Sequence, residues 1–276
     1  MNKKPLRPIT QDLIDQYERD GVVCVRGMFD PEWPELLLKA FERIEHDPEE
    51  HGLLPWAIGG YKYLWHKVPE FRSYVLDSPA AEVVGRVIGA SYTRFFFDQV
   101  FAKDPRSTKP TVWHNDIPGW PTDGEQIPSF WMALTPVCKA NSLECIAGTH
   151  KDETVYWNIT NNSRKMIQPP DRHRCPDMNL RRDDPDLQFL SWDMEPGDAL
   201  VIHPRVLHYS SGNPTDQRRV ALSTRWGGSD IVWNPRPECM NLPGISFDEM
   251  IPGKKPSGPL FPLVWEATPG AGNEDL

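Results

Sequence analysis

The segment TVWHNDIPGW (111–120) holds a histidine and an aspartate two residues apart. Alternate side chains of a strand share one face, so a strand over 111–116 would point His114 and Asp116 in the same direction. With a second histidine they would form the two-histidine, one-carboxylate set that binds Fe(II) and leaves positions open for other ligands. The spacing alone is a weak signal, because H-x-D is common by chance.

The segment VIHPRVLHYSSGNPTDQRR (201–219) offers two histidines for the third ligand position. Periodicity alone does not choose between His203 and His208. The turn-forming residues after His208 predict a hairpin between strands over 205–209 and 219–227, which would put His208 and the arginine pair near one end, on strands about 4.8 Å apart. His203 is followed by a proline and would lie farther back, so this hairpin favours His208.

The same segment ends in two adjacent arginines, and either could bind a carboxylate beside the metal through a two-point guanidinium contact. A strand would place them on opposite faces. Arg218 shares its face with Val220, Leu222, Thr224 and Trp226, whereas Arg219 shares its face with Ala221, Ser223 and Arg225. Small residues leave room for a ligand, so the pattern favours Arg219. The alternative is a surface arginine near a turn.

Composition narrows the class of protein. The chain of 276 residues has a net charge of −9 and 11% aromatic residues, which indicates a folded protein without the dense basic face that nucleic acid requires. Its five cysteines are scattered and contain no C-x-x-C, so neither a disulfide framework nor a cysteine zinc site is expected: Cys24, Cys138, Cys145, Cys175 and Cys239. No apolar run approaches the roughly 20 residues of a membrane span, and we expect a cytoplasmic protein.

The order of elements predicts a mainly β fold. Amphipathic helices are expected in the first 91 residues, over 10–20, 30–47 and 78–90, with a strand over 22–29. Short strands separated by turn residues then indicate a sandwich or barrel: 92–103, 111–116, 129–136, 143–146, 187–193, 198–203, 205–209 and 219–227. We expect one domain (1–276), made of helical decoration (1–91), a core (92–227) with an insertion (150–186), and a C-terminal tail (228–276) that wraps the surface without regular structure.

An ordered set of segments in this chain resembles the phytanoyl-CoA dioxygenase family of Fe(II)- and 2-oxoglutarate-dependent oxygenases. The set consists of QYERDGVVCVRGMF, FDQVFAKDP, WHND, FWMALTPVCKANSLECIAGTHK, PGDALVIHPRVLHYSSGN and RRVALSTRW, and it covers most of the first 227 residues. The resemblance implies a double-stranded β-helix (jelly-roll) core and the use of Fe(II), 2-oxoglutarate and O2. Two departures, Ser142 for glycine and Ala147 for proline, affect a local turn and not the ligands.

The resemblance also implies roles for individual residues. It places iron on His114, Asp116 and His208, and the distal carboxylate of 2-oxoglutarate on Arg219. Further 2-oxoglutarate contacts are implied at Gln99, Trp131 and Ser210. Halogenating relatives lack the carboxylate ligand, so the presence of Asp116 favours oxygenation.

The substrate is predicted to be a small polar molecule. Similarity to the phosphonate-hydroxylating branch suggests 2-aminoethylphosphonate or its N-methylated forms. Aromatic faces and cations suit an ammonium and an anionic group, and the candidate contacts are Tyr61, Trp65, Asn115, Trp120 and Arg225. The alternatives are another small metabolite, an acyl-CoA, a zinc hydrolase and a non-catalytic jelly-roll binding protein. Neither nucleic acid nor membrane is an expected partner, and self-association into a homo-oligomer stays open.

Overall fold

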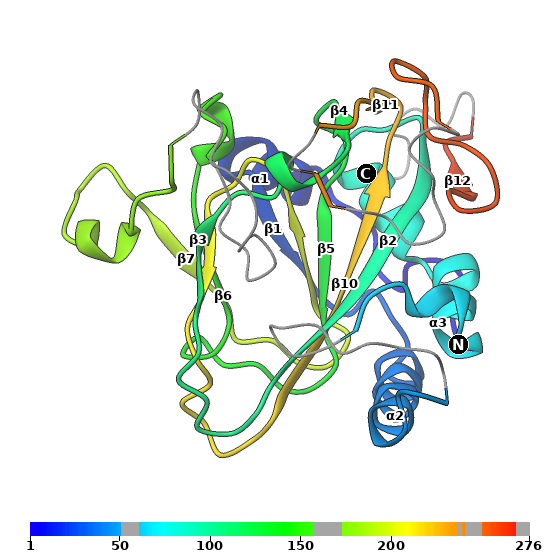
Figure 1. Ribbon diagram of the computed structural model, residues 1–276, viewed down its shortest axis with the longest axis horizontal. Helices are drawn as coiled ribbons and strands as arrows, with labels where there is room; N and C mark the ends of the chain where they lie inside the picture. Colours follow the sequence, from blue (N-terminus) through cyan, green and yellow to red (C-terminus); the bar gives the residue numbers. More distant parts are fainter. Residues whose placement is uncertain (51–60, 157–172, 237–238, 241–249, 269–276) are drawn as a thin grey trace.

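The computed structural model describes residues 1–50, 61–156, 173–236, 239–240 and 250–268. Two antiparallel sheets face each other in a jelly-roll arrangement (Figure 1). The six-stranded major sheet runs in the order β1 (Val22–Val25), β8 (Ala199–Ile202), β5 (Ser129–Ala133), β10 (Arg219–Gly227), β2 (Tyr92–Lys103) and β12 (Leu263–Glu266). The four-stranded minor sheet runs in the order β3 (Thr111–His114), β9 (His208–Ser210), β6 (Leu143–Ile146) and β7 (Phe189–Ser191). A two-stranded ribbon pairs β11 (Val232–Trp233) with β4 (Thr122–Asp123).

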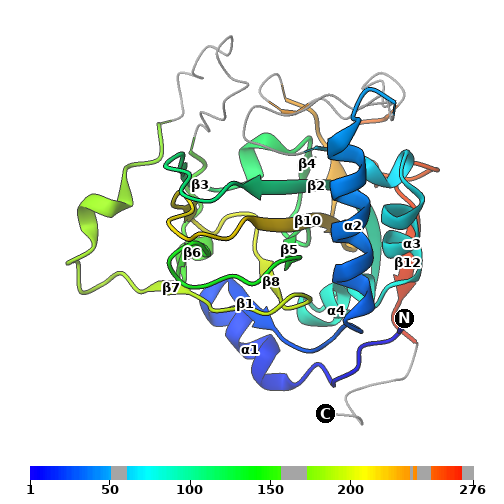
Figure 2. The same cartoon turned by 90° about the horizontal axis from the view of Figure 1, so that it is seen from below.

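Helices cover one face of the major sheet, and the minor sheet covers the other (Figure 2). The α-helices are α1 (Gln11–Asp20), α2 (Glu32–His46), α3 (Pro69–Asp77) and α4 (Ala80–Val87). The 3-10 turns are Leu64–His66, Ile117–Gly119, Thr149–Lys151 and Met178–Arg181. No helix within the described ranges is long and apolar enough to cross a membrane.

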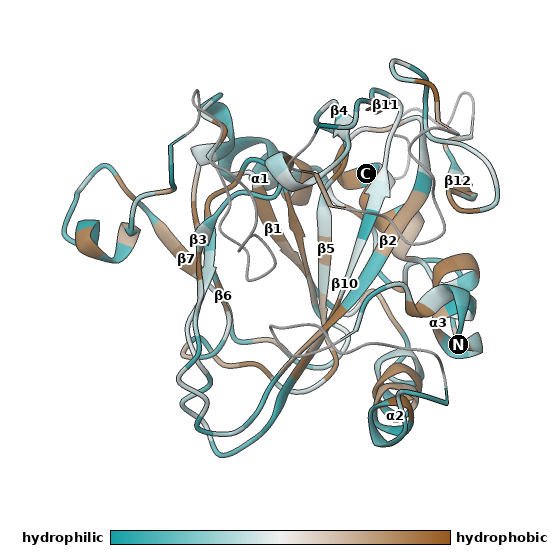
Figure 3. Ribbon diagram, viewed as in Figure 1, coloured by the Kyte–Doolittle hydropathy of each residue, from teal (hydrophilic) through white to brown (hydrophobic). Residues whose placement is uncertain are grey.

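Strict alternation along β10 separates the two faces of the major sheet. Val220, Leu222 and Trp226 pack in the core cluster under the helices. The opposite face, which carries Arg219 and Ala221, looks toward the minor sheet. Helix α2 closes the outer side with side chains at helical spacing, Trp33, Leu37, Phe41 and Ile44, all buried. Figure 3 shows the corresponding hydrophobic segments on β1, β2 and α2.

Several boundaries agree with the sequence analysis and others differ. The strands at 92–103, 143–146 and 219–227 have the expected ends. Helix α3 was not expected, although Pro69 at its first turn is a start signal that a search for short helices would use. The tail is not wholly irregular, because β12 pairs with β2 and thereby covers the edge of the major sheet.

The expected hairpin over 205–227 is wrong. Strand β9 pairs with β3 and β6 in the minor sheet, whereas β10 pairs with β2 and β5 in the major sheet. The segment between them therefore crosses from one sheet to the other instead of reversing within one. His208 and Arg219 therefore lie on strands of different sheets and not on neighbouring strands.

The turn that ends α1 yields a stability prediction. Gly21 has a φ of 74°, and an added Cβ would lie 2.4 Å from Nδ1 of His150, whereas Gly89 has a φ of 63° and open space around it. Alanine in a left-handed backbone conformation lowers the free energy of unfolding by about 1–2 kcal/mol at either position. We expect Gly21→Ala to lower it by at least about 1 kcal/mol more than Gly89→Ala, because His150 must move. Urea unfolding measures both, and equal losses would contradict the packing at Gly21.

Candidate metal centre

Three predicted ligands converge at one point between the sheets. Nε2 of His114 lies 3.7 Å from Oδ1 of Asp116, and Nε2 of His208 lies 3.9 Å from the same oxygen. One ligand atom from each of the three residues lies within 4.8 Å of the other two. Two imidazoles and one carboxylate at these separations fit a single divalent ion with further coordination positions free.

The β3–β9 pair places the two histidines. His114 is directly opposite His208 in the register, and their ring centroids are 4.1 Å apart. The spacing predicted that Asp116 lies on the same strand as His114, and this prediction is wrong. Strand β3 ends at His114, and Asp116 precedes a 3-10 turn. The amides of Asp116 and Ile117 both donate to the carbonyl of Pro204, at 2.8 and 3.0 Å, and this contact turns the carboxylate toward the histidines.

Second contacts orient each ligand. Nδ1 of His114 contacts the carbonyl of Val112 at 2.7 Å, and Nδ1 of His208 contacts the carbonyl of Val206 at 3.0 Å. A carbonyl accepts only from a protonated Nδ1, so each Nε2 is left with its lone pair toward the centre. The hydroxyl of Ser129 donates to Oδ2 of Asp116 at 2.7 Å, which leaves Oδ1 for a metal. Ser129 was missed in the sequence because it lies on β5, far from the motif.

The surroundings of His114 and Asp116 favour the protonation states in which these residues bind metal ions. Burial and the neighbouring His208 lower the pKa of His114 to about 4, so its imidazole is neutral near pH 7. Burial acts to raise the pKa of Asp116, but His208 and Arg225 outweigh it and lower that pKa below its usual value. A neutral imidazole and an ionised carboxylate are the forms that bind metal ions.

A second polar group lies at the start of β10. Arg219 is 2% exposed, and its Nη1 donates to the carbonyl of Asn141 at 2.7 Å and to the hydroxyl of Ser210 at 2.9 Å. Its guanidinium carbon lies 5.5 Å from the centroid of the Trp131 ring, and its Nε has no partner among the described residues. An orphaned donor on a buried guanidinium fits a bound carboxylate.

Lys103 joins this group, and the sequence analysis missed it. It is the cross-strand partner of Arg219, and its Nζ donates to the hydroxyl of Ser210 at 3.1 Å and to the carbonyl of Ser211. Burial and Arg219 lower the pKa of Lys103 to about 7. No carboxylate of the described residues forms an ion pair with Arg219 or Lys103, so two buried cations share one serine. Only the strand register, which the sequence does not show, identifies this lysine.

The rejected alternatives have other partners. Arg218 pairs with Glu45 of α2, with Nη2 2.6 Å from the carboxylate, and also with Asp104. His203 is buried beside His150, with ring centroids 5.1 Å apart, and its Nδ1 accepts from the amide of Arg205. Both residues lie outside the three-ligand cluster.

The remaining predicted residues fall into two groups. Gln99 and Trp131 flank Ser223 on the inner face of the major sheet, and Nε2 of Gln99 has no partner among the described residues. Tyr61 and Trp65 instead pack in the core cluster under the helices, Tyr61 against Phe41 and Trp65 against Phe95. The structure does not bring these two to the metal ligands.

The other three predicted substrate contacts lie near the centre. The amide of Asn115 donates to the carbonyl of Thr154 at 3.2 Å and so ties down the start of the insertion, of which residues 157–172 lie outside the described ranges. Trp120 follows the Asp116 turn, and its ring lies 6.4 Å from that of Phe97. Arg225 stacks over the same Phe97, with its guanidinium carbon 4.6 Å from the ring centroid.

Comparison with known proteins then gives the family. Residues 17–221 match the model of the phytanoyl-CoA dioxygenase (PhyH) family. The chain belongs to this family. It is an Fe(II)- and 2-oxoglutarate-dependent dioxygenase that uses Fe(II), 2-oxoglutarate and O2. No similar sequence was found among curated proteins.

Solved structures share the fold of this dioxygenase at low sequence identity. One is the non-heme alpha-ketoglutarate-dependent carbocyclase SnoK from nogalamycin biosynthesis, at 22% identity and a TM-score of 0.72, covering 96% of this chain and 100% of SnoK. A second is the epimerase SnoN in complex with Fe3+, alpha-ketoglutarate and nogalamycin RO, at 21% identity and a TM-score of 0.72, covering 92% of this chain and 98% of SnoN. A third is EctD from S. alaskensis with 2-oxoglutarate and 5-hydroxyectoine, at 16% identity and a TM-score of 0.69, covering 92% of this chain and 92% of EctD.

The hydrogen bond from Ser129 to Asp116 yields a prediction. We expect Ser129→Ala to weaken metal binding by about 10- to 100-fold, because the carboxylate loses the contact that fixes its free oxygen. Anaerobic Fe(II) titration followed by calorimetry measures this loss. The control is Ser73→Ala, which removes a hydroxyl bonded to Asp77 on α3. Equal Fe(II) affinity in both variants would show that Asp116 is oriented without Ser129.

Proposed function

We propose that this dioxygenase hydroxylates an aliphatic C–H bond of a small anionic substrate. The proposed substrate is 2-aminoethylphosphonate or one of its N-methylated forms, oxidised at the carbon next to phosphorus. The observation that carries the proposal is the excess of positive charge inside the barrel. Asp116 and 2-oxoglutarate together carry one negative charge more than Fe(II), and the buried Asp98 near Arg225 adds a second. Arg219 and Arg225 balance these two charges, and Lys103 adds a positive one. A further anion would balance this charge.

In this proposal His114, Asp116 and His208 hold the iron, and Arg219 holds the distal carboxylate of 2-oxoglutarate. Ser210, which accepts from both Arg219 and Lys103, fixes the two cations for that carboxylate. Trp131 forms the wall beside Arg219, and on the same face the amide nitrogen of Gln99 has no partner among the described residues. Bound iron and 2-oxoglutarate supply the activation of O2 and the oxidation of the C–H bond.

The protein itself supplies orientation and a dry environment. Ser129 and the carbonyls of Val112 and Val206 fix the three ligands before the metal arrives, so little reorganisation is needed. The inner walls are apolar and buried, including Trp131, Leu143 and Ala221. Exclusion of water strengthens the contact of Arg219 with a carboxylate and protects reactive states from side reactions.

The substrate assignment is tested by succinate release across a panel. With Fe(II), 2-oxoglutarate and O2, we expect 2-aminoethylphosphonate or an N-methylated form to stimulate succinate formation at least about tenfold over no substrate. His208→Ala should abolish both basal and stimulated release. Stimulation by an acyl-CoA or a betaine, with inert phosphonates, would overturn the substrate assignment.

The group formed by Arg219, Lys103 and Ser210 yields a prediction about the pH dependence of 2-oxoglutarate binding. A bound carboxylate favours the charged form of Lys103, and because the pKa of Lys103 is about 7 without ligand, binding at higher pH must take up a proton. The affinity for 2-oxoglutarate should therefore fall by about tenfold as the pH rises from 7 to about 9.

The matched variants separate Lys103 from other titrating groups. In Lys103→Met the affinity should be weaker at pH 7 and nearly independent of pH, whereas Lys39→Met on the surface of α2 should behave like the wild type. The visible absorption of the anaerobic Fe(II)–2-oxoglutarate complex reports binding. A pH dependence that survives in Lys103→Met would place the titrating group elsewhere.

A further inference from the structure

Arg225 is buried and forms no ion pair with a carboxylate of the described residues, although Asp116 and Asp98 interact with its charge at longer range. It is 5% exposed on the inner face of the major sheet, and Nη1 donates to the carbonyl of Ser223 at 3.0 Å. In the part of the chain that the structure describes, its Nε has no hydrogen-bond partner and its guanidinium forms no ion pair. A buried guanidinium normally has its donors satisfied and its charge paired, so this one is prepared for a ligand from outside the chain.

The sheet register places Arg225 one step from the metal ligands. Its cross-strand partner on β5 is Ser129, and Ser129 donates to Asp116. Directly opposite residues of an antiparallel pair point to the same face, so Arg225 and Ser129 both point into the barrel. The register also shifts between Arg225 and Trp226, and such an irregularity re-aims side chains at a barrel rim.

Tyr63 approaches the same place from another segment. Its hydroxyl is buried and has no partner among the described residues, and its ring lies 5.8 Å from the ring of Phe97, over which Arg225 is stacked. Its backbone has a φ of 60°, a left-handed conformation that is strained for a tyrosine. The carbonyl of Asp98 accepts from its amide at 3.1 Å and holds this conformation. Two buried donors thus flank one aromatic ring.

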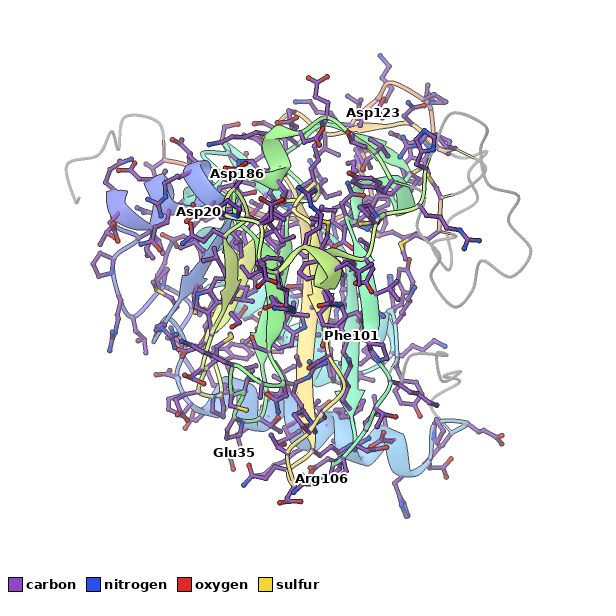
Figure 4. The ribbon with its side chains drawn as sticks, turned by 90° about the vertical axis from the view of Figure 1, so that its left-hand side faces the viewer. Asp20, Glu35, Phe101, Arg106, Asp123 and Asp186 are labelled. Carbon is purple, nitrogen blue, oxygen red and sulfur yellow. The ribbon has the colours of Figure 1, made fainter. Side chains whose placement is uncertain are left out.

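Arg225 and Tyr63 are separate from Arg219, the proposed binding residue for 2-oxoglutarate. Arg219 and Arg225 are six residues apart on one strand, or roughly 20 Å at the rise of an extended chain, so they cannot bind one carboxylate. Figure 4 views the barrel from the side of the minor sheet: Asp123, after the Asp116 turn, marks one end, and Arg106, beside the start of β10, marks the other. Arg225 belongs to the end marked by Asp123.

We infer that Arg225 and the hydroxyl of Tyr63 form an anion-binding subsite beside the metal, which holds a phosphonate or carboxylate group of the substrate. The inference rests on the proposed function in that the substrate is taken to be anionic. A guanidinium and a phenol supply directed donors that suit either oxyanion. The subsite would fix which carbon of the substrate faces the metal.

The test is a binding titration on the anaerobic complex of the protein with Fe(II) and saturating 2-oxoglutarate. Methylphosphonate, acetate and choline serve as probes, followed by calorimetry. We expect the wild type to bind at least one of the two anions. Arg225→Gln should weaken that binding by about tenfold or more, and Tyr63→Phe, which removes only the hydroxyl, by about threefold. The preferred anion identifies phosphonate or carboxylate as the group.

The controls are Arg218→Gln, whose side chain pairs with Glu45, and Tyr74→Phe, whose tyrosine is buried under the helices. Both should bind the anions like the wild type. Equal anion binding in wild type, Arg225→Gln and Tyr63→Phe would overturn the subsite. So would a tenfold loss of 2-oxoglutarate affinity in Arg225→Gln, because Arg225 would then serve the cosubstrate.

Failure of the proposed function is distinguishable from failure of the subsite. Anion binding that depends on Arg225, with no succinate release from any phosphonate, supports the subsite and overturns the proposed substrate. Phosphonate-stimulated succinate release with an unchanged KM in Arg225→Gln supports the proposed substrate and overturns the subsite.

Discussion

The pairing of His114 with His208 across β3 and β9 is the constraint on which the rest of the site depends. Directly opposite positions bring the two imidazoles to a centroid separation of 4.1 Å. Two charged imidazoles at that distance would repel each other, and burial lowers the pKa of His114 further. Burial thus favours the neutral form of His114, whereas Asp116 stays ionised beside it. Backbone carbonyls and Ser129 hold these three side chains ready for a metal ion.

The two sheets contribute different chemistry. The minor sheet and the turn after β3 carry the three candidate metal ligands, and the inner face of the major sheet carries the cations. Alternation along β10 puts Arg219 at one end and Arg225 at the other, with small residues between them. The helices on the outer face pack against the major sheet through the largest core cluster. The length of β10 therefore sets the spacing between Arg219 and Arg225.

The sequence predicts some parts of this site for sound reasons and others by coincidence. Arg219 follows from two-residue periodicity, which is local and holds along the whole of β10. His208 was chosen for a hairpin that does not exist, and only the family resemblance supported it independently. Asp116 points to the histidines because of a turn held by Pro204, not because of strand alternation. Local patterns can be correct about residues and wrong about geometry.

Other features could not be read from local patterns at all. Ser129 and Lys103 join the site through strand register, which pairs residues about a hundred positions apart in the chain in the case of Lys103 and Arg219. The aromatic residues near position 60 looked alike in sequence, yet Tyr61 and Trp65 pack under the helices while Tyr63 lies against Phe97. Tyr63 has a left-handed backbone conformation, and no sequence pattern predicts it.

The most direct test of this account is a crystal structure of the anaerobic complex with Fe(II) and 2-oxoglutarate, with anomalous diffraction measured at the iron edge. We predict one strong anomalous peak, at about 2.0–2.2 Å from Nε2 of His114, Nε2 of His208 and Oδ1 of Asp116. We also predict that the distal carboxylate of 2-oxoglutarate binds Arg219. A peak with His203 among its ligands, or 2-oxoglutarate held at Arg225 instead, would contradict it.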